Sequence, residues 1–140
     1  MEDSKFIANQ LMSIMMPLTR TIAAELRHGE KSLNMAHLGA LAMLTERPCN
    51  LSELADLQGV SLPTMSGSIS RLETRGWVRR ERSTADRRVV MVELTSKGQQ
   101  RLVEMVQRAE SYLIGELEKL DSAERETLAA GLSVLQTLFE

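Results

Sequence analysis

The sequence lacks several features on which other classes of protein depend. Its single cysteine, Cys49, excludes a disulfide within the chain and suits a reducing cytoplasm. Aromatic residues make up only 3% of it, whereas leucine, methionine and alanine abound, which favours the packing of helix on helix. No apolar run approaches the ~20 residues that cross a membrane, and the first residues lack the basic and apolar start of a signal peptide. We therefore expect a cytoplasmic protein that has no membrane partner.

The sequence also lacks the residue groupings that catalysis and metal binding need. Its two histidines, His28 and His37, and Cys49 are scattered without a metal-ligand spacing. No nucleophile–base pair, pair of carboxylates or phosphate-binding loop can be assembled from its motifs. We expect no enzymatic activity, no metal and no cofactor.

Charge is abundant but unevenly distributed along the chain. The net charge is −2, yet residues 71–101 contain nine lysines and arginines against four acids. The rest of the chain contains eight basic and fifteen acidic residues. A basic segment on an acidic body is typical of a protein that presents one face to a polyanion. On charge alone, an ordinary solvated face is the alternative.

Apolar periodicity predicts a mainly α protein with one small β-hairpin, and 140 residues are enough for a single domain with a core. Pro17 lies inside the first helix and is expected to kink it, because proline has no backbone N–H. The last helix opens with a capping-box pattern, Asp121 and Glu124. The six helices are expected at residues 4–28, 34–46, 51–58, 61–75, 95–120 and 121–139.

The two short central helices are joined by a tight turn, "QGVS", and are predicted to form a helix-turn-helix. Ser61 suits the N-cap of the second helix, and Pro63 suits its first turn, where a missing N–H does no harm. Two β-rich runs, "WVRRER" and "RVVMVEL", then flank "STAD", so a hairpin wing follows directly. The residues expected to face inward on the two helices are Leu54, Ala55, Leu57, Met65, Ile69 and Leu72.

The second of these helices has a surface suited to the major groove of DNA. Its first two turns carry small hydroxylated side chains, which let the backbone approach base edges, and two arginines follow within reach of phosphates. Serine lowers helix propensity without adding packing, so a surface that serves only solubility is the less favoured interpretation. DNA contacts are predicted for Ser61, Pro63, Thr64, Ser66, Gly67, Ser68, Arg71 and Arg75.

The tip of the wing gathers further charge, which suits the neighbouring minor groove. Narrow A·T-rich stretches of that groove attract arginine, and Arg87 and Arg88 are placed to enter it. Asp86 would repel phosphate, so we expect it to pair with a tip arginine, or with Arg71 or Arg75, and to fix the angle of the wing. An exposed ion pair of little energy is the alternative. The residues of the wing predicted to take part in DNA binding are Arg82, Asp86, Arg87 and Arg88.

Residues 51–100 resemble the DNA-binding core of the MarR family of winged helix-turn-helix regulators. The most specific part is "RLETRGWVRRERSTADRRVVMVELTSKG", with its R-L-E-x-R-G helix end, its D-R-R wing tip and the L-T-x-x-G start of the next helix. The order of the helices before and after also fits, so the likeness covers nearly the whole chain. It implies one domain over residues 1–140, with a DNA-binding region at 30–100 and dimerisation helices at 1–29 and 101–140.

The resemblance also implies a homodimer whose two winged regions occupy successive major grooves of palindromic double-stranded DNA. Three apolar stripes, on residues 4–28, 95–120 and 121–139, agree with this, because one small winged domain could not bury them alone. By the same resemblance, a small aromatic or phenolic effector would bind between the dimerisation helices and the winged domain. Met35 and His37 could then line its pocket, although a histidine near such a junction is more often a structural residue.

The sequence therefore predicts a dimeric, ligand-responsive transcriptional regulator, and a repressor, because a dimer on a promoter blocks polymerase. Two alternatives stay open. Cys49 lies near Arg47 and just before a helix, as a redox-sensing thiol could, although most such cysteines are simply buried. A winged-helix adaptor that binds proteins and no specific DNA is favoured by the acidic remainder and by the lack of long base-reading side chains early in the helix.

Overall fold

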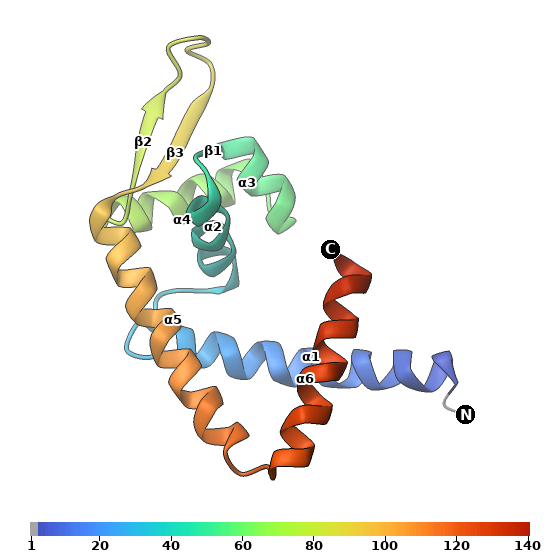
Figure 1. Cartoon of the computed structure of the whole chain (residues 1–140). Coiled ribbons are helices and arrows are strands. Elements are labelled where there is room, and N and C mark those ends of the chain that lie inside the picture. Colours follow the sequence, from blue (N-terminus) through green and yellow to red (C-terminus); the bar gives the residue numbers. More distant parts are fainter. Residues whose placement is uncertain (1–2) are drawn as a thin grey trace.

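A computed structural model describes residues 3–140, which form six helices and a three-stranded sheet (Figure 1). The helices and strands agree in order and type with those expected, except that one short strand was not foreseen. In chain order they are α1 (Ser4–Leu26), α2 (Met35–Glu46), β1 (Cys49–Asn50), α3 (Leu51–Gln58), α4 (Leu62–Thr74), β2 (Val78–Arg82), β3 (Val90–Leu94), α5 (Ser96–Leu117) and α6 (Ser122–Phe139).

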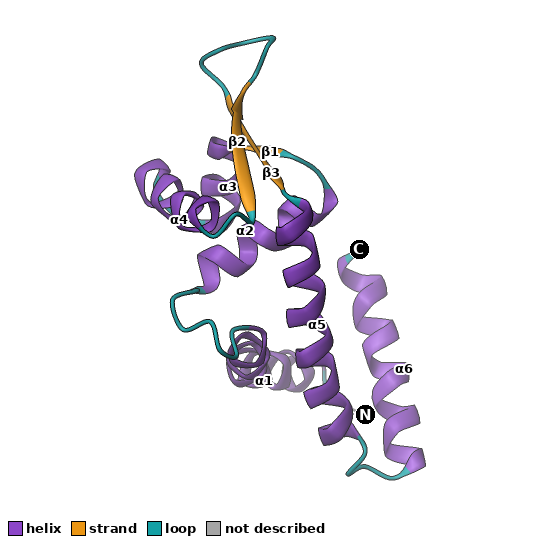
Figure 2. Cartoon of the chain, turned by 90° about the vertical axis from the view of Figure 1, so that its left-hand side faces the viewer, coloured by secondary structure: helices purple, strands orange, loops and turns teal. Residues whose placement is uncertain are grey.

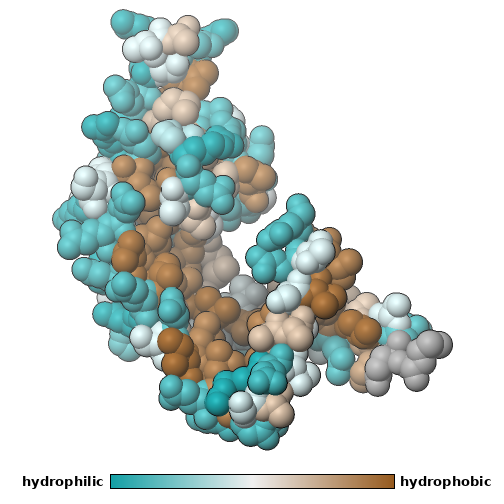
Figure 3. Space-filling model, viewed as in Figure 1, coloured by the Kyte–Doolittle hydropathy of each residue, from teal (hydrophilic) through white to brown (hydrophobic). Residues whose placement is uncertain are grey.

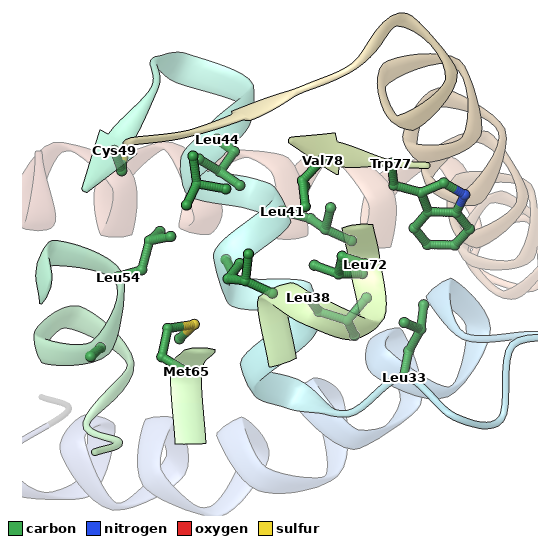
Figure 4. Packing of buried hydrophobic residues seen from close by; sticks show 14 of the residues in the cluster. Leu33, Leu38, Leu41, Leu44, Cys49, Leu54, Met65, Leu72, Trp77 and Val78 are labelled. Carbon is green, nitrogen blue, oxygen red and sulfur yellow. The ribbon is translucent and has the colours of Figure 1, made fainter. Parts of the chain in front are cut away.

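The middle of the chain, α2 to α4 with β1 to β3, folds around one apolar core and is called here the winged unit (Figure 4). Burying each leucine-sized side chain contributes about 1.5–3 kcal/mol, so these contacts are the main source of its stability. The sheet has the order β1-β3-β2 and both of its pairings are antiparallel. Core side chains that are almost fully buried are Leu41, Leu54, Met65, Ile69, Leu72, Val78 and Val92.

Local signals in the sequence set the ends of these elements. Gly59 ends α3 in the left-handed conformation, with φ of 65°, which a side chain would strain. The Ser61 hydroxyl caps α4 by accepting from the Thr64 N–H, and Pro63 lies in the first turn, as predicted. Thr95 caps α5 in the same way, and Asp121 forms the expected capping box on α6.

One predicted core residue is wrong. Leu57 is 65% exposed, whereas Leu54 and Ala55 are buried as expected. Because successive residues turn by about 100° in a helix, Leu57 points roughly 110° away from the centre of the Leu54–Ala55 face. The apolar character of Leu57 suggested burial, but its position on the helix leaves it outside.

The remaining helices, α1, α5 and α6, extend away from the winged unit and are called here the helical arm (Figures 1 and 2). Helix α1 runs unbroken through Pro17 and packs against α5. Along α5, Met105 and Ala109 are buried, but Val106 of the predicted stripe is exposed. Helix α6 has no buried residue at all. No helix within residues 3–140 has the length and apolar character needed to cross a membrane.

The helical arm therefore carries apolar side chains that this chain leaves uncovered (Figure 3). Brown apolar surface follows the lower half of α5 and continues over α6 and α1 in that view. The large apolar residues exposed on the arm include Phe6, Ile7, Met12, Ile14, Met15, Met16, Leu18, Val103, Val106, Ile114, Leu117, Leu128, Leu132, Val134, Leu138 and Phe139.

The arm is joined to the winged unit by a close backbone contact at the start of α5. The Thr95 N–H donates to the carbonyl of Trp77 at 3.0 Å, and the Thr95 hydroxyl donates to the carbonyl of Gly76. Gly98 lies so near that a Cβ there would stand 2.0 Å from the Trp77 carbonyl oxygen. Only glycine allows α5 to leave the sheet at this point.

Candidate nucleic-acid interface

Helix α4 divides into a buried face and a polar face, and the wing stands beside it. Met65, Ile69 and Leu72 pack into the core as predicted. Ser68 packs with them and is only 7% exposed. It follows Met65 by three residues and precedes Leu72 by four, which is the spacing of a single helix face. The structure therefore places Ser68 on the core face of α4 and not on the polar face where the sequence analysis placed it.

The other face of α4 has a small and polar surface near its start. Pro63, Thr64 and Gly67 are exposed, and a Cβ built on Gly67 would meet nothing within 4 Å. The Ser61 hydroxyl donates to the Thr64 hydroxyl at 2.8 Å, which holds both at the helix N-terminus. Of the N–H groups at this helix end, the one of Thr64 is capped by Ser61 and Pro63 has none, so fewer donors than usual face an approaching anion.

Leu62 is a surface residue of this end that sequence reasoning missed. It occupies the first position of α4 and is 48% exposed, although leucine usually signals a core position. Its place between the Ser61 cap and Pro63 was the available signal, because the first turn of a helix has fewer neighbours to pack against. An apolar group here is suited to contact a thymine methyl.

A second residue missed from the sequence is Arg80, which fastens the wing to α4. From β2 its guanidinium donates to the Ser66 hydroxyl at 3.2 Å, to the Ser66 carbonyl at 2.5 Å and to the Ser70 hydroxyl at 2.6 Å. Its backbone N–H donates to the Glu73 carboxylate at 3.2 Å. The angle between the wing and the helix is therefore set by side chains of both. Ser66, a predicted base contact, is half-buried under this arginine.

At the tip of the wing, Asp86 pairs with Arg88, which is one of the partners expected for it. The Asp86 carboxylate accepts from the Arg88 backbone at 3.0 Å and from its guanidinium at 3.1 and 3.2 Å. These hydrogen bonds lower the pKa of the Asp86 carboxyl below its usual range. The Arg88 side chain is nevertheless 91% exposed, so its outer edge faces solvent.

The rest of the wing loop is held by further hydrogen bonds. Arg82 donates to the carbonyl of Arg87 at 2.8 Å, and the Ser83 hydroxyl accepts from the backbone of Ala85 at 3.2 Å. A hollow of about 320 Å³ lies beside this loop, lined by Arg82, Ser83, Thr84 and Arg87. Its two arginines make it a concave, positively charged surface.

The two arginines of α4 have different environments. Arg71 is exposed and forms no ion pair within residues 3–140. Arg75, in contrast, donates to Glu30 and to the Ser32 hydroxyl, and its guanidinium lies 5.1 Å from the centre of the Trp77 ring. Arg75 thus has partners within the chain, which the sequence did not indicate, and its contact with DNA phosphate stays a prediction.

The residues predicted for an effector pocket do not come together. Met35 is exposed at the start of α2, whereas His37 is 2% exposed. The imidazole Nδ1 accepts from the Asn34 N–H at 3.0 Å, and the Asn34 side chain accepts from the His37 N–H, so His37 closes a capping box. A hollow of about 220 Å³ lies between the end of α2, β3 and α5, and neither predicted residue lines it. His37 therefore has a structural role through its Nδ1, and its contact with a ligand stays a prediction.

Cys49 has the opposite of the environment that a sensing thiol needs. It is 1% exposed, and burial raises the pKa of its thiol, an effect that the nearby Arg47 opposes less strongly. A reactive cysteine needs access and a lowered pKa. The structure therefore argues against the redox alternative. Among residues 3–140, no three metal-ligating side chains gather at one point.

Comparison with known proteins places this arrangement. The model of the MarR family matches residues 33–90 of the chain. The HTH-type transcriptional regulator YfiV of Bacillus subtilis (strain 168) is 30% identical over 109 residues, which is 77% of this chain and 68% of that protein. The chain belongs to the MarR family. The family is one of transcriptional regulators that bind DNA through a winged helix, and α3, α4 and the wing are that part of this chain.

Solved structures share the fold over nearly the full length. RV1404 from Mycobacterium tuberculosis superposes with a TM-score of 0.81 at 21% identity, covering 99% of this chain and 95% of that one. BldR from Sulfolobus solfataricus does so with 0.69 at 26% identity, covering 99% and 100%. FabT from Streptococcus pneumoniae, solved in complex with DNA, gives 0.67 at 24% identity, covering 97% and 96%.

Proposed function

We propose that this MarR-family protein is a cytoplasmic homodimeric repressor that binds a palindromic operator and is released by a small molecule. The observation that carries the proposal is the pairing of two features in one chain. The polar face of α4 stands beside an arginine-bearing wing, while α6 has no buried residue. The first feature suits DNA, and the second needs another copy.

The helical arm supplies the argument for a dimer. Helix α6 carries Leu128, Leu132 and Phe139 at helical spacing, and all three are exposed. A monomeric protein rarely exposes so continuous an apolar surface. A second copy offers the same surface in return, because a two-fold interface is self-complementary. Residues 1–29 and 101–140 are accordingly proposed as the dimerisation helices, and residues 30–100 as the DNA-binding region.

The winged unit supplies the argument for reading DNA. The exposed small residues Pro63, Thr64 and Gly67 let the start of α4 approach base edges in the major groove, with Arg71 on phosphate. Arg87 and Arg88 reach the adjacent minor groove from the wing tip. The FabT complex shows that a protein of the same fold has been solved with DNA.

Repression and release complete the proposal. A dimer bound over a promoter excludes polymerase from the same stretch of DNA. The effector, a small aromatic or phenolic molecule, is proposed to bind where the helical arm meets the winged unit, where exposed Met35 is available to it. Binding there would shift the two winged units relative to each other and so favour release.

Selection of bound duplexes from a random DNA pool tests this proposal. We expect enrichment of a palindrome whose half-sites lie about one helical turn apart, as docking of two recognition helices requires. Affinity for the selected duplex should fall steeply with salt, and the slope counts the phosphate contacts.

Two results would count against the proposal. A selected sequence without two-fold symmetry would contradict the dimeric reader. No enrichment, with weak binding that salt abolishes, would favour the adaptor alternative, in which the wing arginines meet an acidic protein.

A further inference from the structure

The junction between the helical arm and the winged unit contains a carboxylate that is bound from both sides. Glu30 lies in the loop between α1 and α2. One of its oxygens accepts from Arg75, the residue that ends α4, and the other accepts from Arg101 of α5 at 2.9 Å. The Glu30 side chain is 19% exposed, and the two arginines are 28% and 27% exposed. We call these three residues the carboxylate bridge.

Each member of the carboxylate bridge is itself held in place. Arg75 also donates to the Ser32 hydroxyl and lies against the face of buried Trp77. Arg101 also donates to Glu104 at 3.0 Å, one turn along α5. The Glu30 N–H donates to the Arg27 carbonyl and its own carbonyl accepts from the Leu33 N–H, so the loop backbone is fixed around the carboxylate. A guanidinium that is bound in this way has little freedom to choose another partner.

Among the described residues, only the ion pairs of Glu30 connect the end of α4 with the helical arm. Of the two oxygens, one holds the end of the recognition helix and the other holds the helical arm. The ion pairs Arg47–Glu53 and Arg79–Glu93 lie within the winged unit, and Lys119–Glu116 lies within the arm. A rotation of α4 relative to α5 must therefore break at least one bond to this carboxylate.

We propose that Glu30 is a positioning residue that sets the angle of α4 to the helical arm, and so the half-site spacing that the dimer accepts. This inference rests on the proposed function, because spacing has meaning only for a dimer on DNA. In such a dimer the distance between the two α4 helices depends on this angle in each protomer. Loss of the bridge should leave the reading of each half-site intact while relaxing the distance between the two.

A measurement without DNA tests the angle directly. A cysteine can be introduced as Gly67→Cys, because a side chain there has open space, and Cys49 is too buried to take a label. Pulsed electron paramagnetic resonance then measures the distance between the spin labels on the α4 helices of the two copies. We expect a narrow distribution in the otherwise wild-type protein and a broad or displaced one in Glu30→Gln.

Matched variants separate positioning from folding. Glu104→Gln removes the charge of the other carboxylate that Arg101 contacts but leaves the bridge, so it should keep the narrow distribution. Arg101→Gln leaves the Glu30–Arg75 pair within the winged unit, so it keeps a folded unit and should broaden the distribution like Glu30→Gln. An unchanged distribution in both bridge variants would overturn the inference.

Spacing on DNA gives the second readout. Duplexes carry two copies of the half-site obtained by selection, with the spacer changed by one or two base pairs, and a further duplex carries one half-site. We expect Glu30→Gln to bind the duplex with the best spacer about tenfold more weakly than the wild type does. Its affinity should also depend less on the length of the spacer, and its affinity for the single half-site should equal that of the wild type. Equal loss on every duplex would overturn the inference alone. Absence of a dimer or of any spacer preference in the wild type would overturn the proposed function and this inference with it.

Discussion

At the scale of single residues, the charged groups of the wing tip have separate tasks. The Asp86 carboxylate accepts three hydrogen bonds, all of them from Arg88, whose side chain is still mostly exposed. The Arg82 guanidinium instead donates a hydrogen bond to the backbone carbonyl of Arg87 in the loop. In the free protein an exposed pair such as Asp86–Arg88 contributes little to stability, at most about 1 kcal/mol. Under the proposed function, the role of this pair is to orient Arg88 before DNA binds.

This orientation leads to a prediction with two variants. Arg88→Ala should weaken binding to the selected duplex by roughly tenfold or more and reduce the salt slope by about one, because a cation leaves the interface. Asp86→Ala should weaken binding through lost orientation with little change in slope. Titration at several salt concentrations measures both. Unchanged affinity in both variants would end the argument for the wing.

His37 leads to a prediction about pH. Burial lowers the pKa of its imidazole below the usual 6.5, and the charges of Arg71 and Arg75 lower it further. As the pH falls below about 6.5, the unfolded chain therefore binds more protons than the folded one. The contribution of His37 to the free energy of unfolding is complete above pH ~6.5 and is lost progressively below it. The loss is about 1.4 kcal/mol for each pH unit by which the pKa is lowered.

Chemical denaturation between pH 5 and 8 measures this dependence. His37→Gln keeps a capping-box acceptor but cannot titrate, so its stability should fall less on acidification than that of the wild type. Parallel curves for the two proteins would show that His37 does not titrate differently in the folded state.

At the scale of elements, the placement of the wing against α4 depends on Arg80. Removing the Arg80 side chain breaks its hydrogen bonds to Ser66 and Ser70. A hydrogen bond from a charged donor contributes about 1.5–3 kcal/mol to stability. Arg80→Ala should therefore lower both thermal stability and affinity for DNA. Arg79→Ala is the matched control, since it removes the same charge from the same strand but from an exposed side chain. Equal loss of affinity in both would indicate net charge rather than positioning.

The junction of β2 and α5 gives a prediction about stability alone. Gly98→Ala would place a Cβ against the Trp77 carbonyl, which is backbone and cannot swing aside, so we expect a loss of about 2 kcal/mol or more. Gly67→Ala is the control, because its Cβ meets open space and alanine favours the helix by about 1 kcal/mol. Thermal unfolding without DNA should move in opposite directions for the two. A stable Gly98→Ala would contradict the close contact.

The sequence predicts these elements well where local chemistry decides them. Ser61, Thr95 and Asp121 cap the starts of helices with their own side chains, and Gly59 marks the turn that ends α3. Strand β1 was missed because two residues carry no alternation, and its pairing with β3 joins segments that lie far apart in the chain. The contacts of Arg75 were missed for the second of these reasons, because Glu30 and Ser32 lie far from it in the chain. The burial of Ser68 could have been foreseen, because its spacing from Met65 and Leu72 places it on the same helix face.

At the scale of the whole molecule, the winged unit and the helical arm need different partners. The winged unit contains most of the core, to which Ala23 and Met105 of the helical arm also belong, whereas the rest of the arm exposes many apolar side chains (Figure 3). Both needs are met at once if the arms of two copies pair and so present two winged units to one duplex. We therefore expect two chains, and not one, to bind each duplex.

Sedimentation equilibrium of the protein, alone and with the selected duplex, tests this claim most directly. The account predicts a free particle of twice the 15.6 kDa of one chain, and two chains on each palindrome. Leu132→Glu, which places a charge on the exposed apolar face of α6, should shift the free protein towards the monomer and weaken binding to the palindrome. A wild-type protein that sediments as a monomer, or that binds the palindrome as one chain, would contradict the account.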